Sequence, residues 1–433
     1  MKKCAAIILA AGKGVRMRSA LPKALSRVSG KPMIEFLINS ARRSKIDDIL
    51  VVGGYKIDLL RKTLAGQGLK IIKQRRLLGS ADAVKQASSH FKNFNGIILV
   101  LYADTPLISH VTIKAMLKKH IRTKSDVTVL SASVEDAKEY GRIARDTDGK
   151  ICGIVEHTDI VNSNTEHRTP NTEINAGAYC FNAKKLFEGL SRIKKNKIKG
   201  EYYLTDIITY FYDKGYKASS YITKDADEAL GVNRRKDLQS ADKILRKRTM
   251  DKLFDAGVTI KDPASAYIEE GVKIGKDTII YPYVVIESGV VVGSCCKIGP
   301  FAHLRRGTVM EKGSCVGNYV EIVRSKIGKG SRAKHHSYIG DTDVGRDANI
   351  GAGVITANYD GRNKHRTIIE DQAFVGSGTT IVAPVRIGKK AMTGAGSVLV
   401  RGSDILPGSI VVGVPARPLS GRNRLKNKKR IKN

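Results

Sequence analysis

From residue 268 onward, an aliphatic side chain recurs at every sixth position of the chain. A period of six fits neither an α-helix nor an ordinary strand. It does fit a short strand followed by a corner, stacked so that each repeated side chain points inward. The pattern therefore predicts a left-handed parallel β-helix of hexapeptide repeats. The register holds through ten consecutive repeats, at Ile268, Ile274, Ile280, Ile286, Val292, Ile298, Leu304, Met310, Val316 and Ile322.

The register continues towards the C-terminus with three interruptions. Two of them are single five-residue steps, and the third is the insertion TANYDGRNKHRTI. Because the six-residue spacing returns after each interruption, we expect one β-helix rather than several. The later positions are Ile327, Ala333, Ile339, Val344, Ile350, Ile369, Val375, Ile381, Ile387, Thr393 and Leu399.

The N-terminal half shows a different pattern, in which short apolar runs alternate with stretches of helical spacing. Runs at 5–11, 49–54 and 96–104 predict buried strands, and residues 31–44 and 110–121 predict helices. This alternation predicts a Rossmann-like α/β domain with a mostly parallel sheet between two layers of helices. The expected parts of the chain are an α/β domain over 1–232, a linker helix over 233–257, a β-helix domain over 258–416 and a basic tail over 417–433.

The formal net charge of +35 raises the question of a polyanionic partner. Aromatic residues make up only 6% of the chain, tryptophan is absent, and the sequence contains no recognition helix, RNA-binding run or zinc finger. A basic surface that serves small anionic substrates explains the charge better than a nucleic-acid partner. A basic nucleic-acid-binding protein remains the alternative from a different functional class.

The six cysteines show no CxxC pair and no metal-ligand spacing. We expect them to be buried small apolar residues in a reducing compartment, with no disulfide and no zinc site. The apolar run near the N-terminus fits a buried strand better than a signal peptide, and no segment approaches the ~18 apolar residues of a membrane span. The expectation is a cytoplasmic protein without membrane insertion.

The segment LAAGKGVRMRSALPK, residues 9–23, joins a predicted strand to a basic turn. It lacks the GKS/T ending of a P-loop, and Met17 stands where the dinucleotide-binding pattern requires its third glycine. Gly12 and Gly14 nevertheless let backbone amides approach phosphate oxygens closely. The segment therefore predicts a different kind of phosphate-binding loop.

Charged side chains stand in positions that suit nucleotide phosphates. Arg16 and Lys23 add positive charge to the loop, and Asp104 follows the apolar run GIILVLY. A lone carboxylate at the carboxyl end of a strand suits Mg²⁺ when nucleotide phosphates supply the other ligands. Together these residues favour nucleotide chemistry.

Eight motifs occur in the order found in sugar-1-phosphate nucleotidyltransferases, and the N-terminal half resembles that family. With the β-helix appended, nearly the whole chain resembles bacterial bifunctional enzymes that combine a uridylyltransferase with an acetyltransferase. The motifs are LAAGKGVRM…LPK, Gln74 with LLGSADA, YAD at 102–104, YGRI at 140–143, IVEH at 154–157, INAG at 174–177, GEYYLTDII at 200–208 and GVN at 231–233.

For the first domain, the resemblance implies uridylyl transfer from UTP to N-acetylglucosamine 1-phosphate, with release of pyrophosphate. Asp104 and Asn233 would hold Mg²⁺, and Lys23 would be a catalytic residue on the phosphates. The product would be UDP-N-acetylglucosamine, a precursor of peptidoglycan and lipopolysaccharide. The implied nucleotide- and sugar-binding residues are Leu9, Ala10, Ala11, Gly12, Lys23, Gln74, Gly79, Ser80, Tyr102, Gly141, Glu156, Asn175 and Asn233. Of these, Gln74, Gly79 and Ser80 would hold the uracil end, and Gly141, Glu156 and Asn175 would hold the sugar.

For the β-helix, the resemblance implies acetyl transfer from acetyl-CoA to glucosamine 1-phosphate. His335 would be the general base, and Glu321 would orient it. The resemblance also implies a homotrimer whose acetyl-transfer sites lie between subunits. The implied substrate- and coenzyme-binding residues are Arg305, Tyr338, Asn349, Ala352, Asn358, Tyr359, Lys364, Ser377 and Ala395.

Two departures from the family pattern bear on acetyl transfer. Val323 stands where the family has a lysine on the sugar phosphate, and Gly413 stands where it has a coenzyme-binding arginine. Arg324 is a candidate to replace the lysine, and the basic tail a candidate to replace the arginine. An alternative function is nucleotidyl transfer alone, with the β-helix serving only trimer assembly. Three smaller departures lie in the first domain. Ser80 and Ala176 stand where the family has threonine, and Ala103 stands where it has glycine.

Overall fold

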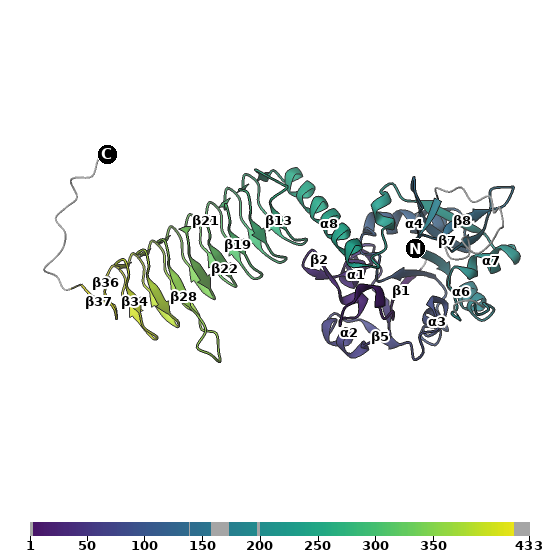
Figure 1. Ribbon diagram of the computed structural model, residues 1–433, viewed down its shortest axis with the longest axis horizontal. Helices are drawn as coiled ribbons and strands as arrows, with labels where there is room; N and C mark the ends of the chain where they lie inside the picture. Colours follow the sequence, from purple (N-terminus) through teal and green to yellow (C-terminus); the bar gives the residue numbers. More distant parts are fainter. Residues whose placement is uncertain (1–2, 138, 157–172, 197–199, 420–433) are drawn as a thin grey trace. The chain divides into compact units, whose positions relative to one another are not determined.

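The chain forms two compact units, residues 1–244 and 245–433. Figure 1 shows an α/β fold in the first and stacked short strands in the second. The C-terminal part of the predicted tail, 420–433, lies outside the described residues. The residues that this computed structural model describes are 3–137, 139–156, 173–196 and 200–419.

The first unit is built on one nine-stranded sheet with the order β11-β7-β10-β6-β1-β4-β5, to which β8 and β9 are attached. A separate small hairpin is formed by β2 and β3. The strands are β1 Cys4–Ala10, β2 Arg27–Val28, β3 Lys31–Pro32, β4 Ile49–Gly53, β5 Lys70–Lys73, β6 Ile97–Tyr102, β7 Val127–Ser133, β8 Arg142–Arg145, β9 Ile151–Val155, β10 Glu173–Asn182 and β11 Ala218–Ile222.

Helices cover both faces of this sheet, as the alternation of apolar runs predicts. Along β1, Ala6 and Ile8 pack with α1 and α4 on one face, whereas Ile7 and Leu9 pack with α3, α6 and α7 on the other. The helices of this unit are α1 Met33–Arg43, α2 Ile57–Thr63, α3 Ser80–Lys85, α4 His110–Arg122, α6 Ala183–Leu190 and α7 Asp206–Asp213, with 3₁₀ turns η1 Val15–Met17, η2 Lys23–Leu25 and η3 Ala226–Ala229.

The sheet is mostly parallel, as the sequence pattern predicted, but it also contains antiparallel strands. Strands β6, β1, β4 and β5 run parallel, and so do β11 and β7. Strand β10 inserts antiparallel between β6 and β7, and β8 pairs antiparallel with both β9 and β10. Buried apolar runs look alike in either direction, so the pattern could not reveal this insertion.

Helix α8, Arg235–Asp255, is the longest described helix and contains the boundary between the two units. Charged side chains occur along its whole length. Among the described helices, this one included, none combines the length and apolar character needed to cross a membrane.

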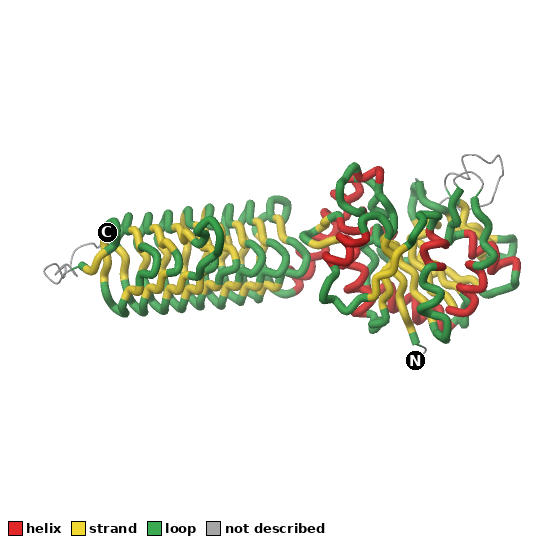
Figure 2. Tube along the Cα trace, turned by 90° about the horizontal axis from the view of Figure 1, so that it is seen from below, coloured by secondary structure: helices red, strands yellow, loops and turns green. Residues whose placement is uncertain are grey.

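The second unit is a parallel β-helix, as predicted. Each coil gives one short strand to each of three parallel sheets, so a strand pairs with the one three places further along the chain (Figure 2). The first sheet contains β12 Thr259–Ile260, β15 Ile279–Ile280, β18 Lys297–Ile298, β21 Cys315–Asn318, β24 Arg332–His335, β27 Asn349–Ile350, β30 Phe374–Val375, β33 Met392–Thr393 and β36 Ile410–Val412, with β37 Arg417–Pro418 antiparallel at its end.

The other two sheets repeat this arrangement. The second contains β13 Tyr267–Ile268, β16 Val285–Ile286, β19 His303–Leu304, β22 Glu321–Val323, β25 Tyr338–Gly340, β28 Ile355–Ala357, β31 Thr380–Val382 and β34 Val398–Leu399. The third contains β14 Lys273–Ile274, β17 Val291–Val292, β20 Val309–Met310, β23 Lys326–Ile327, β26 Thr342–Val344, β29 Thr367–Ile369, β32 Val385–Ile387 and β35 Asp404–Ile405.

The six-residue register is confirmed position by position. Every predicted inward residue, from Ile268 to Leu399, is buried, and the most exposed of them, Ile274, is 8% exposed. Apart from Thr393, which is also buried, these side chains belong to one continuous hydrophobic core along the coil. Burial of each large aliphatic side chain contributes about 1.5–3 kcal/mol to folding. The repeat therefore accounts for the stability of this unit.

The six cysteines are all thiols, but they are not uniformly buried as predicted. Cys180 and Cys296 are buried, whereas Cys295 is exposed at a β-helix corner with φ of 58°. A corner residue in this left-handed backbone region points outward, so the prediction is wrong for Cys295. Cys4, Cys152 and Cys315 are partly buried.

Candidate functional site

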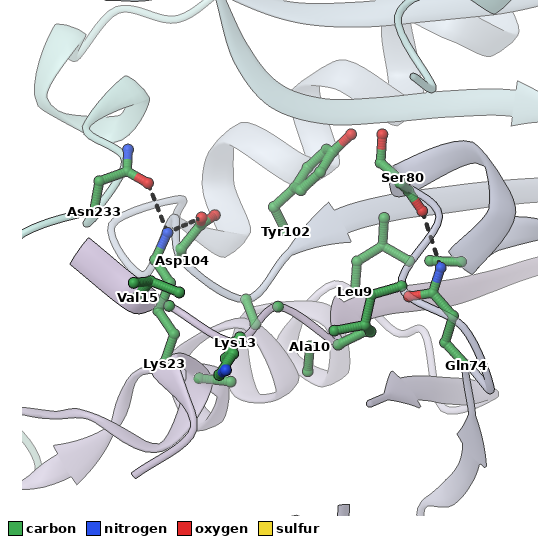
Figure 3. Close-up of a pocket in the computed structure, with 18 of the residues that line it drawn as sticks. Leu9, Ala10, Lys13, Val15, Lys23, Gln74, Ser80, Tyr102, Asp104 and Asn233 are labelled. Carbon is green, nitrogen blue, oxygen red and sulfur yellow. Dashed lines mark hydrogen bonds and ion pairs between the residues drawn. The ribbon is translucent and has the colours of Figure 1, made fainter. Parts of the chain in front are cut away.

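The predicted phosphate loop and Asp104 meet at one cavity in the first unit. Strands β1 and β6 are parallel neighbours, so their carboxyl ends lie at the same edge of the sheet. A cavity of about 460 Å³ opens there. Among the residues that line it are the predicted Leu9, Ala10, Ala11, Gly12, Lys23, Gln74, Gly79, Ser80, Tyr102, Asp104 and Asn233 (Figure 3).

The two loop glycines have different roles. Gly14 has φ of 63°, and a Cβ added there would lie 2.6 Å from Cβ of Lys23. Glycine at this position therefore lets the loop fold back against the lysine. A Cβ added at Gly12 would meet no atom within 4 Å, because this residue faces open space in the cavity. That space is available for a ligand to approach the backbone.

Lys23 joins the two predicted metal ligands. Its Nζ lies 2.6 Å from Oδ2 of Asp104 and 2.7 Å from Oδ1 of Asn233. Arg16 also donates to Oδ1 of Asn233, at 3.0 Å. Because both neighbours of that amide oxygen are donors, the amide has only one orientation that satisfies them.

This arrangement fits a hard divalent cation. Two oxygens, one of them a carboxylate, already converge on a single positively charged nitrogen. Mg²⁺ prefers such oxygen ligands and commonly takes only one or two from the protein, with substrate phosphates and water supplying the rest. Among the described residues, no group of three or more His, Cys, Asp or Glu side chains could hold a metal ion. The Asp104–Asn233 pair is a candidate of another kind, because one of its two ligands is an amide oxygen.

A second cavity, of about 290 Å³, adjoins the first. Ser80, Tyr102, Asp104 and Asn233 line both cavities. The predicted sugar-binding residues Gly141, Glu156 and Asn175 line the second one. The pair Asp104–Asn233 therefore stands where the two cavities meet.

Tyr102 lines both cavities. Burial raises the pKa of its hydroxyl well above the usual value, although a hydrogen bond with Ser80 opposes this shift. Ser80 in turn accepts a hydrogen bond of 2.9 Å from the backbone of Leu204. The hydroxyl of Tyr102 therefore stays protonated at neutral pH, and its bond with Ser80 holds the side chain in place.

Two side chains fix the predicted sugar contacts and were given no role from the sequence. Thr205 donates a 3.0 Å hydrogen bond to Oε1 of Glu156. Nδ2 of Asn175 donates to the hydroxyl of Tyr179 at 2.7 Å, while its Oδ1 accepts from Gly177 N at 3.1 Å. Thr205 lies within the motif GEYYLTDII, but nothing local in that motif indicates its contact with Glu156.

Three predicted acetyl-transfer residues lie on or beside the outer face of the second β-helix sheet. Glu321 is in register with Tyr338 on the next coil, and Arg305 follows the strand on the coil before. Nη1 of Arg305 donates to Oε1 of Glu321 at 2.9 Å. The bonded carboxylate raises the pKa of the Arg305 guanidinium. Arg305, Glu321 and Tyr338 thus form one polar cluster.

His335 ends β24 in the first sheet, at the corner that leads to the second. No hydrogen bond joins it to Glu321 within the described part of the chain, where Glu321 pairs with Arg305 instead. The orienting role predicted for Glu321 therefore stays a prediction. His336, the next residue, stacks on Tyr319 with ring centroids 5.1 Å apart.

The Arg324 side chain is held by Asp341 on the next coil. Its Nε and Nη2 donate to the two carboxylate oxygens of Asp341 at 2.6 and 2.7 Å, and Asn358 donates to the same carboxylate. The pKa of Asp341 is lowered chiefly by this bond to Arg324. Val323 is buried, with 4% exposure. Of the two neighbours Val323 and Arg324, only Arg324 can therefore give the site a positive charge.

Seven corner residues with left-handed backbones form a column along the β-helix. Four of them carry stacked rings, and the next three, Gly353, Gly378 and Gly396, carry no side chain. Each glycine directly follows a predicted coenzyme-binding residue: Ala352, Ser377 or Ala395. The ring-bearing residues are Tyr283, Phe301, Tyr319 and His336.

The predicted acetyl-transfer residues are spread over two sheets and the inserted loop of the β-helix. Asn349 lies in the first sheet, in register with Arg332 and Phe374, whereas Tyr338 lies in the second. Tyr359 and Lys364 pair with each other in the inserted loop.

Comparisons with known proteins agree with both halves of this description. The nucleotidyl transferase family profile matches residues 5–245. The bifunctional protein GlmU of Geobacillus thermodenitrificans is 39% identical over 466 aligned residues, which cover 99% of this chain and all of that protein. The GlmU of Syntrophomonas wolfei is 38% identical, over 95% of this chain and 97% of its own length.

The fold and the first site define a nucleotidyltransferase that carries a hexapeptide-repeat β-helix. The chain belongs to the GlmU family of bifunctional proteins. It is a transferase enzyme with uridylyltransferase and acetyltransferase activities, and its substrates include a nucleotide and sugar phosphates.

Proposed function

We propose that the cavity lined by the glycine loop binds UTP and that the adjoining cavity binds N-acetylglucosamine 1-phosphate. The observation that carries this proposal is the position of Asp104 and Asn233, which line both cavities. Lys13, Arg16 and Lys23 bring positive charge to the first cavity. Two anionic substrates can thus meet without a large charge repulsion.

Asp104 and Asn233 would hold Mg²⁺, which would neutralise phosphate charge where the two substrates meet. Lys23, which now bridges these two residues, would then contact the phosphates. A phosphate oxygen of the sugar attacks the α-phosphorus of UTP, and the bond from that phosphorus to pyrophosphate breaks. This step needs positioning and charge neutralisation rather than a protein nucleophile.

In the β-helix, the amine of glucosamine 1-phosphate attacks the thioester carbon of acetyl-CoA. The carbon–sulfur bond breaks, His335 takes the proton from the amine, and the same proton then passes to the departing sulfur, so that coenzyme A leaves as a thiol. Arg305, Tyr338 and Lys364 hold the sugar phosphate. Asn349, Ala352, Asn358, Tyr359, Ser377 and Ala395 surround the acetyl group and the coenzyme. The glycines that follow Ala352, Ser377 and Ala395 leave room for the coenzyme arm and so support this placement.

Arg324 supplies the sugar-phosphate site with a positive charge that Val323 cannot. Support comes from its bidentate bond to Asp341, which holds the guanidinium beside Tyr338 at a defined place. Because Nε and Nη2 bond to Asp341, the phosphate would be met by the N–H groups of Nη1, and a charge-assisted bond from arginine to phosphate is stronger than a neutral one.

The enzyme works as a cytoplasmic homotrimer without a nucleic-acid partner. The predicted acetyl-transfer residues lie on two different sheets of one chain. This supports trimer assembly, because a neighbouring subunit can complete such a site. The product, UDP-N-acetylglucosamine, would then enter the synthesis of peptidoglycan and lipopolysaccharide.

The test is product analysis with UTP, acetyl-CoA, glucosamine 1-phosphate and Mg²⁺ supplied together. The proposal predicts UDP-N-acetylglucosamine, pyrophosphate and one coenzyme A thiol per product. Formation of the nucleotide sugar only when N-acetylglucosamine 1-phosphate is supplied, without thiol release by a folded trimer, would leave nucleotidyl transfer as the sole activity.

A further inference from the structure

The Gln74 side chain has only one orientation that its neighbours allow. The residue is 3% exposed, and its backbone N–H donates to the carbonyl of Gly53 at 2.8 Å. Its side-chain nitrogen donates to the carbonyl of Gly79 at 3.0 Å and to Oδ2 of Asp82 at 2.7 Å. Both of these atoms only accept hydrogen bonds, so the nitrogen of Gln74, and not the oxygen, must face them.

The side-chain oxygen of Gln74 therefore points the other way. Figure 3 shows it directed towards Ala10 and Leu9, which line the first cavity. Among the described residues it has no hydrogen-bond partner. An acceptor on an almost fully buried side chain is usually hydrogen-bonded, and here the donor can come only from what fills the cavity, either water or a bound ligand.

Asp82 makes the stronger of the two bonds that fix this orientation. It lies in the first turn of α3, behind Gln74 and outside the cavity lining. Its other carboxylate oxygen is 3.3 Å from Nε2 of Gln86. A hydrogen bond to a carboxylate is stronger than one to a neutral carbonyl, so Asp82 resists rotation of the Gln74 amide more than Gly79 does.

We propose that Asp82 is a positioning residue that makes the nucleotide pocket select pyrimidines with a hydrogen on ring nitrogen 3. The inference rests on the proposed function, in which UTP binds in the cavity that Gln74 lines, and it adds that the base lies against Gln74. Uracil carries a donor on that nitrogen, whereas cytosine carries a lone pair there. A fixed oxygen on Gln74 bonds to uracil and repels cytosine, and the repulsion contributes as much to selectivity as the bond does.

The test compares UTP with CTP as substrate for the full-length enzyme, with each kcat/KM measured at saturating N-acetylglucosamine 1-phosphate and Mg²⁺. In Asp82→Ala, we expect the UTP-to-CTP ratio of kcat/KM to fall about tenfold, mainly through a higher KM for UTP. Asp82→Asn keeps an oxygen for Gln74 but not the charge, so its ratio should fall between those of Asp82→Ala and the wild type. Gln86→Ala removes the other contact of the same carboxylate and should keep the wild-type ratio.

Equal losses with UTP and CTP in Asp82→Ala would give Asp82 only a structural role and would overturn the inference. If Asp82→Ala does not fold, Asp82→Asn decides alone, and a ratio equal to the wild type's overturns the inference. Wild-type enzyme that forms no product from UTP would instead refute the proposed function. The two failures are therefore distinguishable.

Discussion

Nζ of Lys23 lies 2.6 Å from Oδ2 of Asp104, and this ion pair stands where the two cavities of the first unit meet. Both side chains are mostly buried, with exposed fractions of 14% and 28%. The same ammonium also bonds to Asn233. The lysine therefore neutralises the Asp104 carboxylate and bonds to the Asn233 amide oxygen, the two groups proposed to hold the metal.

Replacing Lys23 by methionine should separate metal binding from catalysis. In the protein without nucleotide, Lys23→Met should bind Mn²⁺ about threefold or more tightly, because the competing ammonium is removed from Asp104 and Asn233. Uridylyl transfer by the same variant should fall about 100-fold, because a cation on the phosphates is lost. Electron paramagnetic resonance of Mn²⁺ measures the first effect, and initial rates measure the second.

Lys13→Met is the matched control for this experiment, because Lys13 lines the same cavity and does not bond to Asp104. It should change Mn²⁺ affinity less than Lys23→Met does. Equal effects of the two substitutions would mean that only general charge matters, contrary to the proposed competition.

Replacing Arg324 by alanine should weaken acetyl transfer through substrate binding. The KM for glucosamine 1-phosphate should rise about 10- to 100-fold, because one charge-assisted contact to phosphate is lost. Arg366→Ala is the control, since Arg366 makes a similar bidentate bond to Asp343 in the third sheet. Thiol-release assays measure both variants, and an unchanged KM in Arg324→Ala would remove Arg324 from the site.

Glu173 should make stability depend on pH. Burial raises the pKa of this carboxyl, but hydrogen bonds from Arg145, Ser131 and Ser220 outweigh the burial and lower it below the ordinary 4.5. A lowered pKa stabilises the fold above that ordinary value, and the stabilisation is lost as the pH falls through the folded-state pKa. Glu173→Gln should therefore cost about 3 kcal/mol at pH 7.

Urea unfolding followed by tyrosine fluorescence checks this prediction in the transition that belongs to the first unit, which contains Glu173. The difference between wild type and Glu173→Gln should shrink as the pH is lowered below about 4.5. A difference that is constant from neutral pH to acid would show that the carboxylate charge is not the cause.

The β-helix could be predicted from the sequence because its structure follows from a local six-residue repeat. The side chain of Ile286 points inward for the same reason as those of Ile268 and Leu304, and one period describes all three. The position of β10 between β6 and β7 could not be predicted in this way, because strand order depends on contacts between distant segments.

The same distinction holds for the sites. Gly12 and Asp104 could be placed together, because the carboxyl ends of parallel strands share an edge. The hydrogen bond between Gln74 and Asp82 and the one between Thr205 and Glu156 each join separate elements, so no local motif reveals them. The pairing of Glu321 with Arg305 also emerges only from the stacking of coils.

The most direct test of the central claim is the rate of UDP-N-acetylglucosamine formation by Asp104→Asn over a wide range of Mg²⁺ concentrations. Thiol release by the same preparation serves as the internal control, because the acetyl-transfer residues lie in the other unit. We predict a loss of about 100-fold or more at every Mg²⁺ concentration, with thiol release unchanged. Nucleotide-sugar formation at the wild-type rate would contradict the account.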